Sequence, residues 1–140
     1  MNRYESNSMA IKFINPKNSP PPAANYTNLA VVPQNHRLLV LAGQIGNLMD
    51  GTLVDGLEAQ YKQALKNILS IVESEGGTAG DIARITIFLT EKPGDHSLIK
   101  AANDDVFNGQ NPAMSWLYVA GLFRPDVKVE IEAIASVSVD

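Results

Sequence analysis

The segment near the carboxyl end of the chain alternates apolar and polar residues with a period of two. Every second position is apolar in this row: Val127, Val129, Ile131, Ala133, Ala135, Val137 and Val139. Because successive side chains of a strand point to opposite faces, one face is apolar and the other carries Glu130, Glu132 and Ile134. The pattern predicts a strand whose apolar face is covered by helices and whose second face points away from them.

The second face of this strand carries two carboxylates, Glu130 and Glu132. Carboxylates rarely face a packed surface unless they are paired with a cation or take part in chemistry. A β-prone run over residues 114–119 puts Met114, Trp116 and Tyr118 on one face of a neighbouring strand, where they would form an apolar wall beside a buried acid. Packing in the core or in a subunit interface explains the same three side chains equally well, and an ion pair is the simpler interpretation of Glu132.

Two segments have the period of an amphipathic helix. Between residues 57 and 72 apolar residues recur at three- and four-residue spacing, and Gly76 then supplies a residue that tolerates positive φ. Asp95 or Ser97 can cap a second helix that ends near Phe107. The two helices are predicted to pack on the same face of a sheet, in an α+β architecture.

The expected number of strands is six, because four further segments are β-prone: 11–14, 29–32, 37–42 and 82–90. The sequence PQNH between the second and third of these segments has the turn chemistry of a hairpin. The Pro- and Asn-rich residues 15–25 are expected to form a surface loop. Residues 1–10 are polar and patternless, so we expect a flexible extension followed by one domain over residues 11–140.

Composition excludes several classes of function. The chain has 140 residues, a net charge of −4 and scattered basic residues, so a nucleic-acid partner is not expected. The absence of cysteine excludes disulfides and thiolate nucleophiles, and His36 and His96 lack metal-ligand spacing, so we expect ordinary surface histidines and no metal site. No apolar run approaches the ~20 residues of a membrane span and no signal peptide is evident, which predicts a soluble, cytoplasmic protein.

A sheet covered by helices on one side leaves its other face open. With Trp116, Tyr118 and Ile134 on that open face, the sheet would hold more apolar surface than a monomer usually exposes. Association with further copies of the same chain is the natural way to cover this surface, so we expect a homo-oligomer.

Several motifs together resemble the RidA/YjgF family of enamine/imine deaminases. They are LAGQIG at 41–46, Gly-Gly at 76–77 after a helix, DIARITIFLT at 81–90, NPA at 111–113 and above all DVKVEIEAIA at 126–135. The resemblance covers roughly residues 24–137. It implies a chorismate-mutase-like fold, a six-stranded mixed sheet with two helices on one face, and a homotrimer with small-molecule clefts between subunits. Active members of the family hydrolyse 2-enamine and 2-imino acids to 2-keto acids and ammonium, without a metal or organic cofactor.

The resemblance also implies roles for individual residues. Glu130 matches the glutamate that positions the attacking water, and Tyr26 matches a tyrosine of the cleft. Met114 stands where the family has the arginine that binds the substrate carboxylate. Substrate binding is further assigned to Trp116, where a cysteine is usual, to Lys100, where an asparagine is usual, and to Gly43. A backbone requirement at the end of a strand would also explain Gly43.

The replacement of arginine by Met114 has a calculable consequence. A guanidinium makes two charge-assisted hydrogen bonds to a carboxylate, each contributing about 1.5–3 kcal/mol, and a thioether makes neither. The loss corresponds to about two to four decades in affinity, so activity on 2-iminobutyrate is expected to be low. Lys100 and Arg124 are the candidate replacement cations, although neither reproduces the geometry that the family arginine supplies.

Two functions stay open on this basis. The first is hydrolysis of an imine or enamine other than the usual 2-imino acid, with Glu130 as general acid or base. The second is a non-catalytic small-molecule sensor or binding protein on the same fold. Ribonuclease activity, which is associated with some members of the family, is the weakest interpretation because the chain is acidic and has no basic run.

Overall fold

The computed structural model describes residues 10–139, so residues 1–9 of the extension expected over 1–10 lie outside the described residues. The described part contains six strands and two α-helices. Their bounds are β1 Lys12–Ile14, β2 Leu29–Val31, β3 His36–Gln44, α1 Leu57–Ser74, β4 Ile82–Leu89, α2 His96–Phe107, β5 Ala113–Tyr118 and β6 Val129–Ser138, with a short 3-10 helix at Ala79–Asp81.

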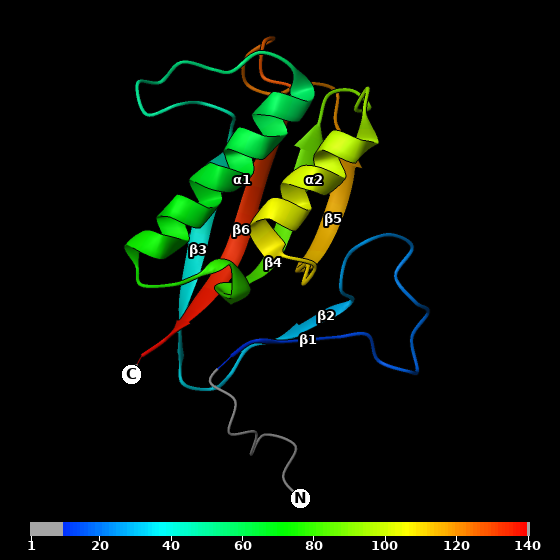
Figure 1. Ribbon diagram of the computed structural model, residues 1–140, viewed down its shortest axis with the longest axis vertical. Helices are drawn as coiled ribbons and strands as arrows, with labels where there is room; N and C mark the ends of the chain where they lie inside the picture. Colours follow the sequence, from blue (N-terminus) through cyan, green and yellow to red (C-terminus); the bar gives the residue numbers. More distant parts are fainter. Residues whose placement is uncertain (1–9, 140) are drawn as a thin grey trace, which may run out of the picture.

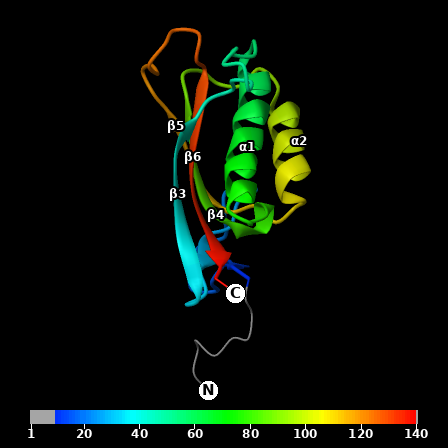
Figure 2. The ribbon, with the colours of Figure 1, turned by 90° about the vertical axis from the view of Figure 1, so that its left-hand side faces the viewer.

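Four of the strands form a mixed sheet in the order β3-β6-β4-β5 (Figure 1). β6 runs antiparallel to both β3 and β4, and β4 runs parallel to β5. Both helices cover one face of this sheet, and within residues 10–139 no helix lies on the other face (Figure 2). The predicted α+β architecture with two helices on one face is therefore confirmed.

The predicted strand pairing is wrong in two respects. β1 and β2 pair only with each other, as a separate antiparallel ribbon, so the six strands do not form a single sheet. The hairpin expected around PQNH does not form, because β2 pairs with β1 whereas β3 pairs with β6. Turn residues indicate where a chain bends, but the partner of each flanking strand is chosen by contacts with distant segments.

The core lies between the sheet and the helices. The alternating row of β6 is buried from Val127 to Val137, as predicted, whereas Val139 lies beyond the end of β6 and is 60% exposed. α1 contributes a continuous apolar stripe to this core: Leu57, Tyr61, Ala64, Leu65, Ile68 and Val72. Each large apolar side chain that is fully buried in this way stabilises the fold by about 1.5–3 kcal/mol.

Local capping fixes the position of α2 against the rest of the molecule. Asp95 is the N-cap, as expected, and its side chain accepts a hydrogen bond from the backbone N–H of Ser97. Glu58 of α1 accepts hydrogen bonds from the backbone N–H groups of Gly94 and Asp95, at 2.7 and 3.0 Å. These contacts tie the start of α2 to α1. Within residues 10–139, neither helix combines the length and the apolar character that a membrane crossing requires.

Candidate functional site

The register of β5 decides which way its side chains point. Met114 lies opposite Ile85 of β4 and Trp116 lies opposite Ile87. Both isoleucines are buried under the helices, so Met114 and Trp116 also point to the helix-covered side and pack against the core. The interpretation that placed Trp116 and Tyr118 on the open face is therefore wrong, because residue parity alone does not say which of the two faces the helices cover.

A cavity of about 590 Å³ opens between α2, β5 and the loop that leads into β2. This volume is in the range of small-molecule sites. Four of the residues assigned to binding line it together, namely Tyr26, Lys100, Met114 and Trp116. The remaining lining residues are Ala24, Asn25, His96, Ile99, Asn103, Asp104, Asn111 and Ser115.

The loop that carries Tyr26 is tied to the start of β5. The hydroxyl of Thr27 donates to the carbonyl of Asn111 at 2.7 Å, and the side-chain amide of Asn111 donates to the carbonyl of Asn25 at 2.6 Å. The Tyr26 hydroxyl accepts a hydrogen bond from the backbone N–H of Ala23. Although it follows a proline-rich segment, Tyr26 is thus held at the edge of the cavity.

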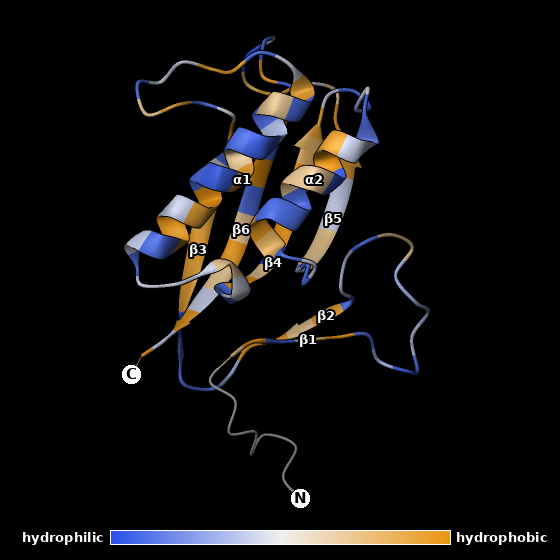
Figure 3. Ribbon diagram, viewed as in Figure 1, coloured by the Kyte–Doolittle hydropathy of each residue, from blue (hydrophilic) through white to orange (hydrophobic). Residues whose placement is uncertain are grey.

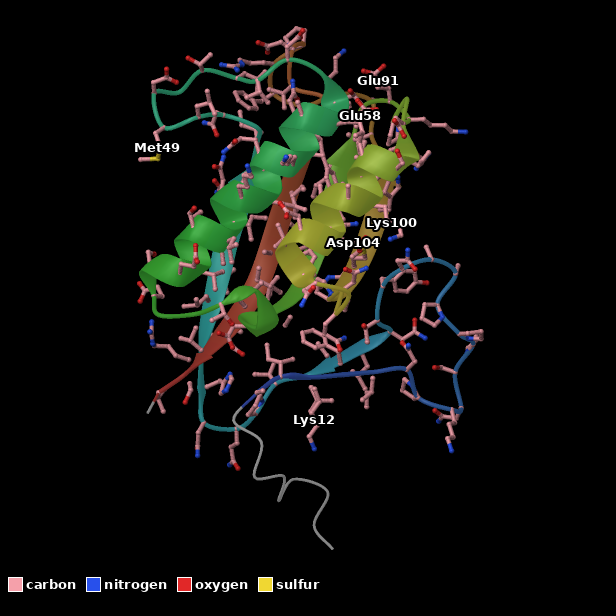
Figure 4. The ribbon with its side chains drawn as sticks, viewed as in Figure 1. Lys12, Met49, Glu58, Glu91, Lys100 and Asp104 are labelled. Atoms are coloured by element: carbon pink, nitrogen blue, oxygen red, sulfur yellow. The ribbon has the colours of Figure 1, made fainter. Side chains whose placement is uncertain are left out.

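The charge of Lys100, on the cavity lining, is already paired. Lys100 Nζ lies 2.6 Å from Asp104 Oδ2 one turn along α2, and both residues line the cavity (Figure 4). Arg124, the other candidate replacement, pairs with Asp126 and is not among the residues that line this cavity. His96, expected to be an ordinary surface residue, is exposed but borders the cavity at the start of α2.

One buried polar group of the cavity wall is Asn103 of α2, which sequence reasoning missed. It is only 9% exposed, and its side-chain oxygen accepts a hydrogen bond of 2.7 Å from the hydroxyl of Tyr61. Tyr61 is fully buried and contacts Trp116, with ring centroids 6.0 Å apart, and burial raises the pKa of its phenol. The sequence did contain a signal for this residue, because Asn103 follows the apolar Ile99 by one helical turn and therefore lies on the inner face of the helix.

Glu130 lies on the opposite side of the sheet. In β6 it pairs with Phe88 of β4 and alternates with the buried Val129 and Ile131, so its side chain points to the open face. There it lies over Gly43 of β3, where an added Cβ would be 2.7 Å from Glu130 Cδ. Gly43 does not have a positive φ. The backbone explanation for Gly43 is therefore replaced by a steric one, because a Cβ at this position would displace the Glu130 carboxylate from its place over β3.

Glu132 follows on the same open face and is exposed. The basic residue nearest to it in the sequence, Lys128, pairs with Glu91, with Nζ 3.5 Å from Oε1. Within residues 10–139, neither Glu130 nor Glu132 forms an ion pair. In the same described range, no three His, Cys, Asp or Glu side chains are grouped closely enough to hold a metal ion.

The predicted apolar wall and acid do not meet within one chain. Met114 and Trp116 lie on the helix-covered side, whereas Glu130 and Gly43 lie on the open side of the same sheet. The sequence correctly indicated that each group shares one face of its own strand. It did not indicate that the two groups face opposite ways, because that depends on the register between β4, β5 and β6.

The open face also exposes large apolar side chains. Leu38 and Val40 of β3 are 61% and 75% exposed, and Ile134, which pairs with Val40, is 39% exposed. β3 is drawn mostly in the hydrophobic colour (Figure 3), and no helix covers this side of the sheet (Figure 2). Contiguous apolar surface of this kind marks an interaction site more often than a free surface.

Comparison with known proteins gives a consistent result. The family model described as endoribonuclease L-PSP matches residues 16–137. The 2-iminobutanoate/2-iminopropanoate deaminases of Salmonella typhimurium and Escherichia coli are 36% and 37% identical to the chain over 102 residues, which is 70% of this chain and 78% of each relative.

Solved structures agree with these sequence matches. The Rid family protein YyfB of Yersinia pestis, described as a protein of unknown function, superimposes with a TM-score of 0.79 at 29% identity, over 91% of this chain and 98% of its own. The YjgF protein of E. coli gives a TM-score of 0.63 at 34% identity, over 89% and 97% of the two chains. The fold, the matched family model and the sequence relatives together show that this chain belongs to the RidA/YjgF (Rid) family.

Proposed function

We propose that the protein is a homotrimeric imine or enamine hydrolase whose clefts each combine groups from two copies of the chain. In each cleft the α2–β5 cavity of one copy supplies binding groups, and Glu130 over Gly43 of a second copy supplies the acid. The observation that carries this proposal is the location of the two groups on opposite faces of one sheet. A single chain cannot bring them to the same substrate, whereas a second copy lying on the open face can.

Two further observations support association through the open face. Leu38, Val40 and Ile134 expose apolar surface there, and a second copy would remove this surface from water. The sequence relatives from S. typhimurium and E. coli are named imine deaminases, which supports the same reaction class for this chain.

The chemistry assigned to Glu130 is that of a general base and then a general acid. Its carboxylate accepts a proton from a water molecule while the water oxygen bonds to the imine carbon, the π electrons of the carbon–nitrogen double bond pass to nitrogen, and the nitrogen takes a proton from solvent. In the second step the carboxylic acid gives its proton to the nitrogen, the carbon–nitrogen bond breaks, and ammonia leaves while the hydroxyl group loses its proton to solvent and becomes the carbonyl. One imine and one water thus yield one carbonyl compound and one ammonia.

The cavity does not suit the usual 2-imino acids. Met114 provides no hydrogen bond to a substrate carboxylate, and the charge of Lys100 is compensated by Asp104 at 2.6 Å. We infer that the substrate is a different imine or enamine with a larger apolar part. The same two features favour the second candidate, a binding protein without catalysis.

The decisive experiment couples the protein to a pyridoxal-phosphate lyase that releases imines and follows their decay. We expect acceleration with imines that carry apolar side chains, and a loss of at least about 100-fold in the Glu130→Gln variant. Glu132→Gln is the matched control, because Glu132 is the neighbouring carboxylate on the same face. If no imine in the panel decays faster with the wild-type protein, the hydrolase is excluded and the binding protein remains.

A gain-of-function variant tests the assignment of the cavity separately. Met114→Arg would add a guanidinium to the cavity wall. We expect hydrolysis of 2-iminobutyrate to increase by about two decades, because two charge-assisted hydrogen bonds to the substrate carboxylate are restored. An unchanged rate in a variant with the wild-type melting temperature would show that this wall does not contact the substrate.

A further inference from the structure

The side-chain amide of Asn103 has a free donor at the cavity. Its oxygen is bonded to Tyr61, but its nitrogen makes no hydrogen bond to any of residues 10–139. The only side-chain polar atom in that range that is both sealed from solvent and unpaired is Asn111 Oδ1. The nitrogen of Asn103 is therefore open to solvent although 91% of the residue is buried, and the space that Asn103 borders is the α2–β5 cavity.

The orientation of this amide is held by Tyr61. The Tyr61 side chain is fully buried; its phenol carries its proton at neutral pH, and burial raises its pKa further. The hydroxyl therefore donates to Asn103 Oδ1, at 2.7 Å, and turns the NH₂ group toward the cavity. Trp116 packs against the same tyrosine, so its ring limits the movement of Tyr61.

The charges around the cavity disfavour an anionic ligand. The Lys100–Asp104 pair contributes one positive and one negative charge to the cavity lining. A carboxylate that enters the cavity would lose hydration, meet no unpaired cation and lie near Asp104. A neutral carbonyl oxygen needs only a hydrogen-bond donor, and the side-chain nitrogen of Asn103 supplies one that has no partner among residues 10–139.

We propose that Asn103 is the ligand-anchoring residue of this cavity and that the cavity takes an uncharged molecule with a carbonyl-type acceptor and a compact apolar body. The apolar body lies against Ile99, Met114 and Trp116, which line the same cavity. Tyr61 is a positioning residue, because it acts through the orientation of the Asn103 amide. This assignment rests on the proposed function for the role of the cavity in binding, but it does not depend on catalysis.

Binding can be measured without a known substrate, because Trp116 is the only tryptophan of the chain and lines the cavity. The probes are cyclohexyl methyl ketone and cyclohexanecarboxylate, which have nearly the same shape and differ in charge. The carboxylate does not absorb at the excitation wavelength of tryptophan, and the ketone absorbs there only weakly, so its absorbance is corrected for in the titration. We expect the ketone to change the fluorescence of Trp116 with a dissociation constant at least about tenfold below that of the carboxylate, with titration calorimetry as the second measurement.

Variants of Asn103 test the anchor itself. Asn103→Leu should weaken binding of the ketone about tenfold, and Asn103→Asp should do the same because it presents an acceptor to an acceptor. Asp105→Asn, on the same helix but not lining the cavity, is the control and should leave the affinity unchanged. If neither Asn103 variant folds, Tyr61→Phe keeps the ring, frees the amide to rotate and should weaken the ketone by a smaller factor.

Three results would overturn this inference: carboxylate binding as tight as ketone binding, ketone affinity unaffected by the Asn103 variants, or no binding of either probe at millimolar concentration. The imine assay is run in parallel on the wild-type protein. Hydrolysis without discrimination between the probes would remove only the role of Asn103, whereas discrimination without hydrolysis would remove only the proposed catalytic activity.

Discussion

The two faces of the four-stranded sheet contribute different halves of a candidate site. The helix-covered face has the cavity, with the buried amide of Asn103 and a paired Lys100. The open face has Glu130 fixed over Gly43, together with exposed apolar side chains on β3. Binding groups and the acid are thus separated by the sheet itself. Because of this separation, the function is best tested on an assembly of several chains.

The largest expected effect follows from a charge on the open face. Val40→Asp would place a carboxylate in the proposed interface, where an unpaired charge costs several kcal/mol. We expect the assembly to dissociate to a species of 15.1 kDa, measured by light scattering at micromolar concentration. Leu98→Asp, an exposed apolar position on α2, is the control and should leave the mass unchanged. A wild-type protein that is already monomeric would refute the role of the open face in association.

The next effect is on activity. Gly43→Ala would place a Cβ 2.7 Å from Glu130 Cδ and displace the carboxylate. We expect imine hydrolysis to fall about 100-fold, as in Glu130→Gln, with little change in melting temperature because Gly43 has no positive φ. Gly121→Ala adds a Cβ to open space and serves as the control. Full activity in Gly43→Ala would show that Glu130 does not need the glycine at position 43 for its function.

A glycine under the helices should behave differently. At Gly46 an added Cβ would lie 2.5 Å from the backbone Cα of Gln60 in α1, so the helix itself would have to move. We expect Gly46→Ala to lower the free energy of unfolding by about 1–3 kcal/mol, measured from the denaturant midpoint. An unchanged midpoint would mean that α1 can shift to accommodate the Cβ. The packing of the helix-covered face would then be less rigid than the short distance indicates.

The smallest expected effect concerns the link between α1 and α2. Hydrogen bonds from the backbone N–H of Asp95, and to a lesser extent of Gly94, lower the pKa of the Glu58 carboxyl below its usual 4.5. A carboxyl whose folded-state pKa is depressed stabilises the fold above about pH 4.5, and this contribution is lost as the pH falls through the lower folded-state value.

Glu58→Gln should therefore lower the melting temperature by at most a few degrees at pH 7, and the difference from wild type should shrink progressively below pH 4.5. Glu73→Gln is the control on the same helix, because the Glu73 side chain makes no hydrogen bond within residues 10–139. A difference that is constant from pH 7 down to the acid transition would contradict the assigned role of the carboxylate.

Local features of the site were predictable from the sequence, and its assembly was not. The sharing of one face by Met114 and Trp116 follows from the period of a strand, and the cap at Asp95 follows from its place before an apolar helix pattern. Asn103 was missed because its neighbours on the inner face of α2 indicate core packing. The polar side chain can be interpreted only from its hydrogen bond with Tyr61, which is 42 residues away in sequence.

By itself the sequence determined the strands, the helices, the apolar row of β6 and the family, because each depends on residues close together in the chain or on motif order. Tertiary structure alone decided that β3 pairs with β6, that Met114 lies under α2, and that Glu130 lies over Gly43 on the far side. Register and strand order are set by the simultaneous burial of distant segments against one another, and no local pattern contains that information.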